Sequence, residues 1–362
     1  MDISHSVGFL DFVLINGRMW FCNIFTGSII SLNLETNEFF YEVNTDINSI
    51  NSKTQYGSVE LVGNELYFVP RNATQIFVFN IKDKSTRFIE LEAINDTYTK
   101  PLFLSVCKKN ADLYLIPGRY PSLVRLDTKT KEVRYESIVD RKPNELLGSN
   151  AVLVGDELII GRSDRKSCLI FDLSTGEQHT YSLEHEELVP LTALAIRDKV
   201  MFAGFGNKIA VFDIRQKEIH WIDEYCDSII PKEGIGQLLC YDNQIFAVSM
   251  NQPVIYEVSL ESNCINKWVE FEWGNGKNSV FDSFTKCDVI GAKVIEEKMV
   301  LYSTVRNSII EINMKTKEIK YHDEFIWDAK SRQGYVNEYL SNNQFMIEGE
   351  ITLKDFIDSL KD

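Results

Sequence analysis

The stretch Ile170-Phe171-Asp172-Leu173-Ser174-Thr175-Gly176-Glu177 contains an apolar run, one polar residue and then a turn sequence. The apolar run is typical of a β-strand, and Ser-Thr-Gly is typical of a tight turn because these residues favour turn conformations. The same phrase occurs seven times in the chain, and its central polar residues are Asn33, Asn80, Asp127, Asp172, Asp213, Ser259 and Asn313. From Asn33 to Asn313 there are six intervals over 280 residues, about 47 residues each. A period of this length predicts a repeat architecture.

Each repeat has the same four parts. A first apolar strand, such as Val59 to Val62, is followed by a tight turn and by a second strand, such as Leu66 to Val69. The second strand is a continuous apolar run, which indicates burial from both sides. The quoted phrase is the third strand, and a fourth strand alternates apolar and polar residues, which indicates a half-exposed outer edge. Seven units of four antiparallel strands predict an all-β, seven-bladed β-propeller. The alternative of two β-sandwiches does not account for seven returns of one pattern.

The third-strand phrases resemble the degenerate blades of bacterial kelch-like and quinoprotein-like propellers, over about residues 7–325. The signatures of WD40 blades and the double glycine of kelch blades are missing, so the resemblance implies architecture only. We expect the propeller over residues 1–329 and a C-terminal extension over residues 330–362. In the extension, Thr352 can cap a short amphipathic helix from Leu353 to Leu360. We expect this helix to pack on the propeller; the alternative is a docking helix for a partner.

Composition and charge narrow the class of protein. The chain has 362 residues, 44% of them hydrophobic, and a formal net charge of −15. The apolar content predicts a folded soluble protein, and the acidity argues against nucleic acid or a membrane as partner. The N-terminal residues Met1-Asp2-Ile3-Ser4 lack the features of a signal peptide, so we expect a cytoplasmic protein.

Cysteine and histidine spacing gives no sign of a structural cross-link or metal. The seven cysteines contain no C-x-x-C pair, and we expect them to be reduced and to pack as small apolar residues. The five histidines form no metal-binding pair, and we therefore expect neither a metal site nor a cofactor.

Arginines recur in the loops between the second and third strands. By resemblance to propellers in general, these loops form the face over the central channel where ligands are recognised. Five arginines lie in them, 7 to 10 residues before the polar residue of their repeat: Arg71, Arg119, Arg162, Arg165 and Arg306. Equivalent loops project toward one rim, so the pattern predicts a site for an anion such as a phosphate, a sugar acid or a peptide carboxylate. The alternative is that each arginine pairs with a nearby acidic inter-blade connection.

Aromatic residues extend the predicted site. The long connection between the sixth and seventh repeats, residues 271–284, contains Trp273, which together with Tyr120 offers a surface for stacking a sugar or a peptide side chain. Alternatively, the aromatic residues of the connection fold it onto the ring. The predicted ligand-binding set is Arg71, Arg119, Tyr120, Arg162, Arg165, Trp273 and Arg306.

The sequence thus predicts a recognition propeller whose ligand is an anionic small molecule, a glycan or a peptide segment. An enzyme, a lyase or hydrolase with channel carboxylates such as Glu233, Asp282 and Asp288, is the first alternative, although no common catalytic motif occurs. Inter-blade carboxylates that hold Ca²⁺ belong to the same alternative. A protein-interaction scaffold is the second.

Overall fold

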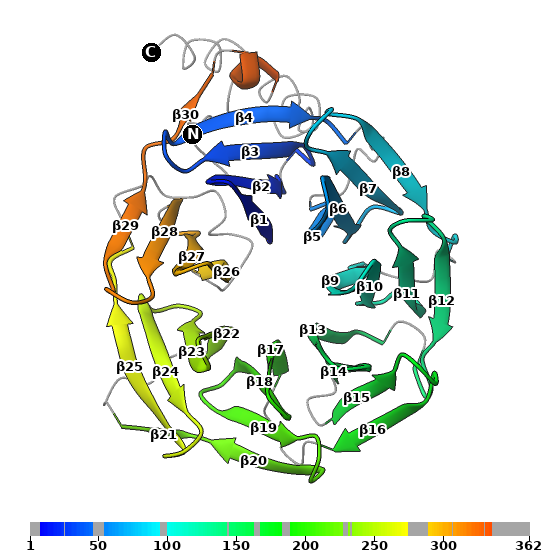
Figure 1. Ribbon diagram of the computed structural model, residues 1–362, viewed down its shortest axis with the longest axis vertical. Coiled ribbons are helices and arrows are strands. Elements are labelled where there is room, and N and C mark those ends of the chain that lie inside the picture. Colours follow the sequence, from blue (N-terminus) through cyan, green and yellow to red (C-terminus); the bar gives the residue numbers. More distant parts are fainter. Residues whose placement is uncertain are drawn as a thin grey trace, which may run out of the picture.

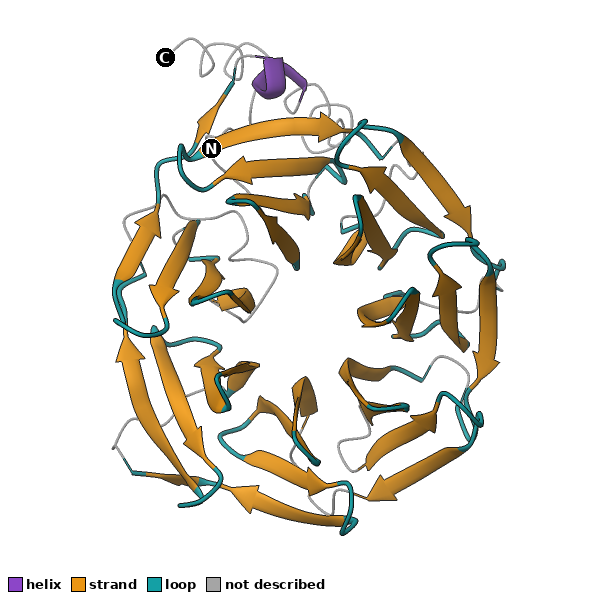
Figure 2. Cartoon of the chain, in the orientation of Figure 1, coloured by secondary structure: helices purple, strands orange, loops and turns teal. Residues whose placement is uncertain are grey.

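The structure is a computed structural model, and it has the predicted architecture: an all-β ring of seven four-stranded antiparallel blades (Figure 1). Strands and turns make up almost all of the chain that it describes (Figure 2). It describes residues 8–24, 26–45, 54–94, 100–142, 145–162, 167–182, 189–226, 231, 234–273, 289–305, 307–328 and 330–334.

The strands follow one another around the ring, and each blade takes its four strands from one continuous stretch of chain. Blades 1 to 3 are β1 (Phe12–Ile15), β2 (Arg18–Cys22), β3 (Ile29–Asn33), β4 (Glu38–Val43); β5 (Tyr56–Val62), β6 (Glu65–Pro70), β7 (Gln75–Asn80), β8 (Thr86–Glu90); β9 (Phe103–Lys109), β10 (Asp112–Pro117), β11 (Ser122–Asp127), β12 (Val133–Ser137). Blades 4 and 5 are β13 (Leu147–Val154), β14 (Glu157–Arg162), β15 (Ser167–Asp172), β16 (Gln178–Ser182); β17 (Val189–Ile196), β18 (Lys199–Phe205), β19 (Ile209–Asp213), β20 (Glu218–Ile222). Blades 6 and 7 are β22 (Ile235–Tyr241), β23 (Gln244–Ser249), β24 (Val254–Ser259), β25 (Cys264–Glu270); β26 (Val289–Ile295), β27 (Lys298–Ser303), β28 (Ser308–Asn313), β29 (Ile319–His322). Two short strands, β21 (Glu224–Tyr225) and β30 (Ile326–Trp327), add to the outer edges of blades 6 and 1.

The core lies between blades. Strand β6 shows why its sequence is continuously apolar: Leu66 and Phe68 pack toward blade 1, whereas Tyr67 and Val69 pack toward blade 3. Successive side chains of a strand point to opposite faces, and in a propeller both faces are covered by a neighbour. Seven such apolar clusters occupy the seven blade interfaces, including the one between blades 7 and 1. The ring is therefore closed by the same packing that joins its other blades.

The polar residue of the repeated phrase holds the turn between the third and fourth strands. In blade 4, Asp172 Oδ1 accepts hydrogen bonds from the backbone N–H groups of Ser174 and Thr175, at 2.8 and 3.0 Å. A side-chain oxygen bonds the backbone of the following turn in the same way in every blade, from Asn33, Asn80, Asp127, Asp213, Ser259 and Asn313. This Asx-type turn is the physical reason that a short polar residue recurs at this place.

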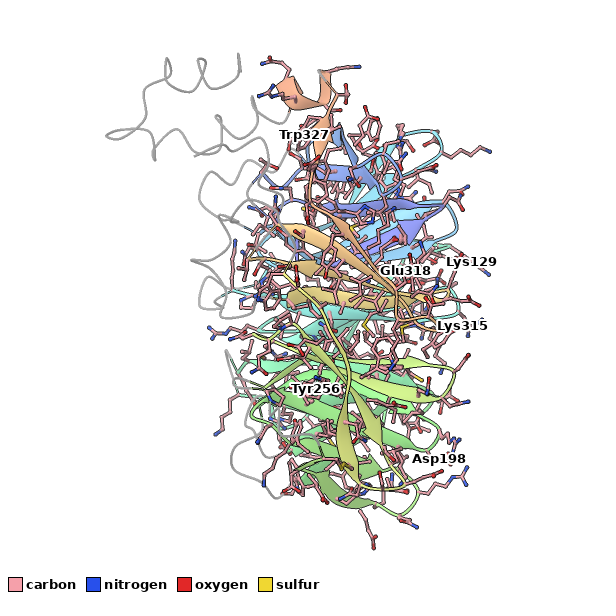
Figure 3. The ribbon with its side chains drawn as sticks, turned by 90° about the vertical axis from the view of Figure 1, so that its left-hand side faces the viewer. Lys129, Asp198, Tyr256, Lys315, Glu318 and Trp327 are labelled. Atoms are coloured by element: carbon pink, nitrogen blue, oxygen red, sulfur yellow. A yellow bond between two sulfur atoms is a disulfide. The ribbon has the colours of Figure 1, made fainter. Side chains whose placement is uncertain are left out.

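Viewed from the side, the ring is a flat disc (Figure 3). Lys129 and Lys315, in turns between third and fourth strands, and Asp198, in a turn between first and second strands, lie on one face of the disc (Figure 3). The loops between second and third strands leave the opposite ends of these strands and form the other face.

The C-terminal part of the chain continues past blade 7 onto blade 1. Strand β30 pairs in parallel with β4, and the N–H of Ile326 donates to the carbonyl of Asn37 at 2.9 Å. Phe325 and Trp327 pack on Phe39 of blade 1, with ring centroids 4.9 and 5.0 Å apart. A helical turn includes residues 330–334, and Gly334 lies against Tyr41. The predicted helix from Leu353 to Leu360 lies outside the described residues.

The structure corrects the expectation that all cysteines are reduced. Cys226 and Cys264 form a disulfide across 38 residues, with their Cα atoms 6.4 Å apart, within the usual range. The spacing of the cysteines in the sequence does not indicate this disulfide. Parallel pairing of β21 with β25 brings Cys226 and Cys264 together. Four other cysteines, Cys22, Cys107, Cys168 and Cys240, are free thiols that are buried or half-buried. Disulfides are typical of proteins in oxidising compartments. The cytoplasmic location stays a prediction.

Candidate ligand site in the central channel

A cavity of about 320 Å³ lies among the inner strands, toward the face of the loops between second and third strands. It is lined by residues just before β1, by residues of β5, β9, β22 and β26, and by Arg71, which follows β6. These inner strands surround the centre of the ring (Figure 1). The cavity therefore lies at the channel mouth, on the face where the resemblance to propellers in general led us to expect a ligand.

One position of the repeat supplies much of the lining. Asp11, Ser58, Ser105, Gln237 and Gly291 all line the cavity. Each stands 22 residues before the polar residue of its repeat, as in 33 − 11 and 80 − 58. Sequence reasoning missed these residues because it treated the first strand as uniformly apolar. The signal that finds them is a polar or small residue recurring in that strand at the period of the repeat.

Irregular pairing near this position shapes the lining. The register of β5 against β6 shifts between Tyr56 and Ser58, and that of β26 against β27 shifts between Ile290 and Lys293. Bulges of this kind redirect the side chains that follow them. Gly291 has a φ of +65° in its shifted segment, a conformation that favours glycine.

Arg71 is fixed in place by its backbone and its stem. Its N–H donates to the carbonyl of Gln55 at 2.8 Å, and its carbonyl accepts from the N–H of Leu102 in blade 3 at 2.7 Å. Its aliphatic stem covers Gly57, where an added Cβ would lie 3.3 Å from both Cβ and Cδ of Arg71. Burial lowers the pKa of its guanidinium, and no carboxylate of the described residues pairs with it. The guanidinium is thus a cation in the wall of the cavity without a described counter-charge.

The other charges of the wall have partners. Asp11 Oδ1 lies 2.6 Å from Lys293 Nζ, and Asp11 Oδ2 accepts from the N–H of Val59 at 3.0 Å. Glu60 Oε1 lies 3.6 Å from Lys108 Nζ. Burial raises the pKa of Glu60, and the lysines only partly offset this effect.

Neutral polar groups complete the lining. Ser58 Oγ donates to the carbonyl of Leu104 at 3.3 Å, which links blade 2 to blade 3. Ser105 Oγ is buried and has no hydrogen-bond partner among the described residues. Gln237, in blade 6, brings an amide to the same cavity. A hydroxyl in the cavity wall without a described partner can donate a hydrogen bond to a ligand or accept one from it.

The structure separates two of the predicted site residues from the cavity by burying them elsewhere. Arg162 is buried and pairs with Glu145 at 2.5 Å, as the alternative explanation of the arginines predicted. Tyr120 is buried between blades 2 and 3, where its ring stacks on Phe103 at 4.7 Å and its hydroxyl donates to the carbonyl of Glu92.

Arg119 and Trp273 also lie away from the cavity lining. Arg119 donates its N–H to the carbonyl of Pro101 at 2.9 Å. Trp273 packs edge-on against Phe271, at 5.7 Å, in the cluster between blades 6 and 7. Outside the described residues lie two further predicted arginines and the three carboxylate candidates: Arg165, Arg306, Glu233, Asp282 and Asp288.

Metal-binding and membrane-spanning features are absent from the described ranges. Within them, no group of three or more His, Cys, Asp or Glu side chains is arranged to hold a metal ion. In the same part of the chain, no helix is long and apolar enough to cross a bilayer.

Comparison with known proteins supports the fold. No protein-family model matches the sequence, and no curated protein matches it. Among solved structures, virginiamycin B lyase from Staphylococcus aureus is similar with a TM-score of 0.64 at 12% identity, over 84% of this chain and 94% of that chain. BamB from Moraxella catarrhalis has a TM-score of 0.52 at 13% identity, over 84% and 83% of the two chains. A chain of the mitotic checkpoint complex has a TM-score of 0.57 at 11% identity, over 90% and 89%.

At such low identity these similarities establish the fold and nothing finer. The chain is a seven-bladed β-propeller, and its structural neighbours include a lyase and a component of a protein complex. This fold typically serves binding or scaffold roles and also carries enzymes, so function has to be argued from the site.

Proposed function

We propose that this protein is a recognition propeller that binds an anionic ligand in the cavity at its channel mouth. The ligand class is an anionic small molecule, an acidic glycan or a peptide segment with a terminal or side-chain carboxylate. The observation that carries the proposal is Arg71, a half-buried guanidinium in the cavity wall with no carboxylate partner among the described residues. Partial removal of a charge from water is unfavourable unless the charge is paired, and an anionic ligand supplies the pair.

The surroundings of Arg71 support this assignment. The site is concave, it lies where inner strands from five blades meet, and its volume is at the lower end of the range for small-molecule pockets. A guanidinium holds a carboxylate through two parallel hydrogen bonds, which gives orientation as well as affinity. The finer resemblance to kelch-like or quinoprotein-like propellers adds no ligand to this proposal.

The test is a binding measurement on the full chain and on Arg71→Ala, with a panel of sugar acids, acidic oligosaccharides, phosphate and acidic peptides. Loss of a charged hydrogen-bond donor costs about 1.5–3 kcal/mol, so Arg71→Ala should weaken binding by roughly 10- to 100-fold. Isothermal titration calorimetry measures the dissociation constant directly.

The matched control is Arg134→Ala, which removes the same charge from the outer strand β12, where Arg134 is exposed and pairs with Glu132. It should bind like the wild type. Equal affinity of Arg71→Ala and Arg134→Ala for every ligand that binds the wild type would contradict the proposal.

An enzyme is the second candidate, because two carboxylates, Asp11 and Glu60, line the same cavity and burial raises the pKa of Glu60. A carboxyl group with a raised pKa is suited to proton transfer. If the protein is a lyase or hydrolase, incubation with a bound ligand should yield product, and Glu60→Gln should abolish turnover while the ligand still binds. A ligand that is recovered unchanged would leave recognition as the function.

A further inference from the structure

The charges of the cavity wall leave room for one negative charge in the ligand. Asp11 and Lys293 neutralise each other at 2.6 Å, and Glu60 is offset by Lys108 at 3.6 Å. Arg71 is then the single cation of the described wall without a described counter-charge. A second negative charge on the ligand would approach Glu60 or Asp11 and be repelled, so a monoanion fits this wall better than a phosphate dianion.

The remaining lining favours hydroxyl groups on the rest of the ligand. Ser105 Oγ has no described partner, Gln237 carries both a donor and an acceptor, and Glu60 is an acceptor. An ammonium group would be attracted by Glu60 but repelled by Lys108 and Lys293, both of which act on that carboxylate. A neutral hydroxyl donates to Glu60 without this repulsion.

Size limits the ligand further. The cavity has a volume of about 320 Å³. It suits a compact molecule of about ten to fifteen non-hydrogen atoms.

We propose that the ligand is a small polyhydroxylated monocarboxylate, a monosaccharide acid, with its carboxylate on Arg71 and its hydroxyls on Glu60, Ser105 and Gln237. This assignment rests on the proposed function, since it takes the channel-mouth cavity as the binding site. It adds the chemical class of the ligand and three residues that select it.

The experiment titrates the full chain with matched probes by calorimetry. D-Glucuronate and D-galacturonate carry both features, D-glucuronamide lacks the charge, and cyclohexanecarboxylate lacks the hydroxyls. Inorganic phosphate and L-alanine test the dianion and the ammonium. At least one sugar acid should bind at least tenfold tighter than each of the other four probes.

Variants then assign the groups. Arg71→Lys keeps the positive charge but loses the planar guanidinium, so the affinity for the sugar acid should fall at least tenfold. Glu60→Gln should lower the affinity for the sugar acid at least threefold and leave the affinity for cyclohexanecarboxylate unchanged. Glu132→Gln, an exposed carboxylate next to β12, is the control and should change neither. Thermal melting of each variant verifies that it is folded.

Two failures are distinguishable. If phosphate, alanine or an acidic peptide binds with Arg71 dependence and more tightly than every sugar acid, the ligand class is wrong and the recognition function stands. Equal binding of sugar acids and cyclohexanecarboxylate would also overturn the class. If no probe, including acidic oligosaccharides and peptides, binds in an Arg71-dependent manner, the proposed function falls together with the inference.

Discussion

At the scale of single residues, two polar positions recur in the repeat and make different kinds of hydrogen bond. The residue at the end of each third strand bonds the backbone of the next turn, as Asn313 does for Lys315 and Thr316, both at 2.9 Å. A polar residue in or just before the first strand lines the channel-mouth cavity in several blades, and Asp11 accepts the N–H of Val59 in the next blade. In blade 5, Thr192 does the same for Leu238, at 3.0 Å. The first position makes hydrogen bonds within one turn, whereas the second makes hydrogen bonds between neighbouring blades.

The local role predicts a modest and measurable loss. Asn313→Ala removes the acceptor of two turn N–H groups, so the free energy of unfolding should fall by about 1 kcal/mol. Glu318→Ala in the same turn is the control, because its side chain is exposed, and it should change the stability by less than about 0.5 kcal/mol. Urea denaturation followed by fluorescence measures both. Equal stabilities of the two variants would show that the Asx turn contributes nothing.

At the scale of elements, short strands tie each of two blades to the next. Strand β21 leaves blade 5 and pairs in parallel with β25 of blade 6, and β30 leaves blade 7 and pairs in parallel with β4 of blade 1. The ring closure between blades 7 and 1 and the connection between blades 5 and 6 therefore both use parallel pairing of a short strand with the outer strand of the next blade. At the first of these places, the Cys226–Cys264 disulfide adds a covalent link.

This link predicts a specific loss of stability. Cys226→Ser should lower the free energy of unfolding by about 2–4 kcal/mol, because the bond closes a loop of 38 residues that is open in the variant. Cys240→Ser, which removes a half-buried free thiol, is the control and should cost less. Mass spectrometry of the non-reduced tryptic digest should find the two cysteines in one linked species. Two separate alkylated peptides in the natively purified protein would contradict the disulfide.

At the scale of the whole molecule, closure joins the two ends of the described chain. Phe9 of the N-terminal segment stacks on Tyr302 of blade 7 at 4.6 Å, and Lys293 of blade 7 pairs with Asp11. On the outer side, His322 Nδ1 lies 2.7 Å from Asn37 Oδ1 in blade 1. These contacts all join blade 7 to the first blade, and the Asp11–Lys293 pair also lines the channel-mouth cavity. Ring closure and the candidate ligand site therefore share the residues Asp11 and Lys293.

Blade 7 predicts a pH dependence through Glu311, whose neighbour His322 also contacts Asn37 of blade 1. This carboxylate lies beside His322 and 3.0 Å from Lys298, and these partners lower its pKa to about 2. Because the folded-state pKa lies below the unfolded value, the stabilisation is fully present above about pH 4.5 and is lost as the pH falls toward about 2. The wild type should exceed Glu311→Gln in stability by about 1–2 kcal/mol at pH 6, after allowance for partial solvent screening.

Urea denaturation of both proteins between pH 6 and pH 2.5 checks this, and the difference should shrink as the pH falls. Glu318→Gln in the adjacent turn, which is exposed, should show no such pH-dependent difference. A constant difference between the wild type and Glu311→Gln across this range would contradict the role of the charge.

The sequence determined the architecture and only part of the site. Strand alternation, turn residues and the polar residue at Asp172 and its equivalents act over a few neighbouring residues, so their pattern is visible along the chain. The seven returns of that pattern predicted the seven blades, and the face of the cavity followed from the order of the strands. Arg71 was found because its loop recurs.

Only the tertiary structure decided which polar groups meet. Tyr120 and Arg162 were predicted for the site, yet one packs between blades and the other pairs with Glu145, because burial depends on the neighbouring blade. Asp11 and Lys293 are 282 residues apart in the sequence and 2.6 Å apart in the ring, and Cys226 meets Cys264 through parallel strand pairing. Local interactions set the form of each blade, whereas ring closure brings distant side chains within reach of one another.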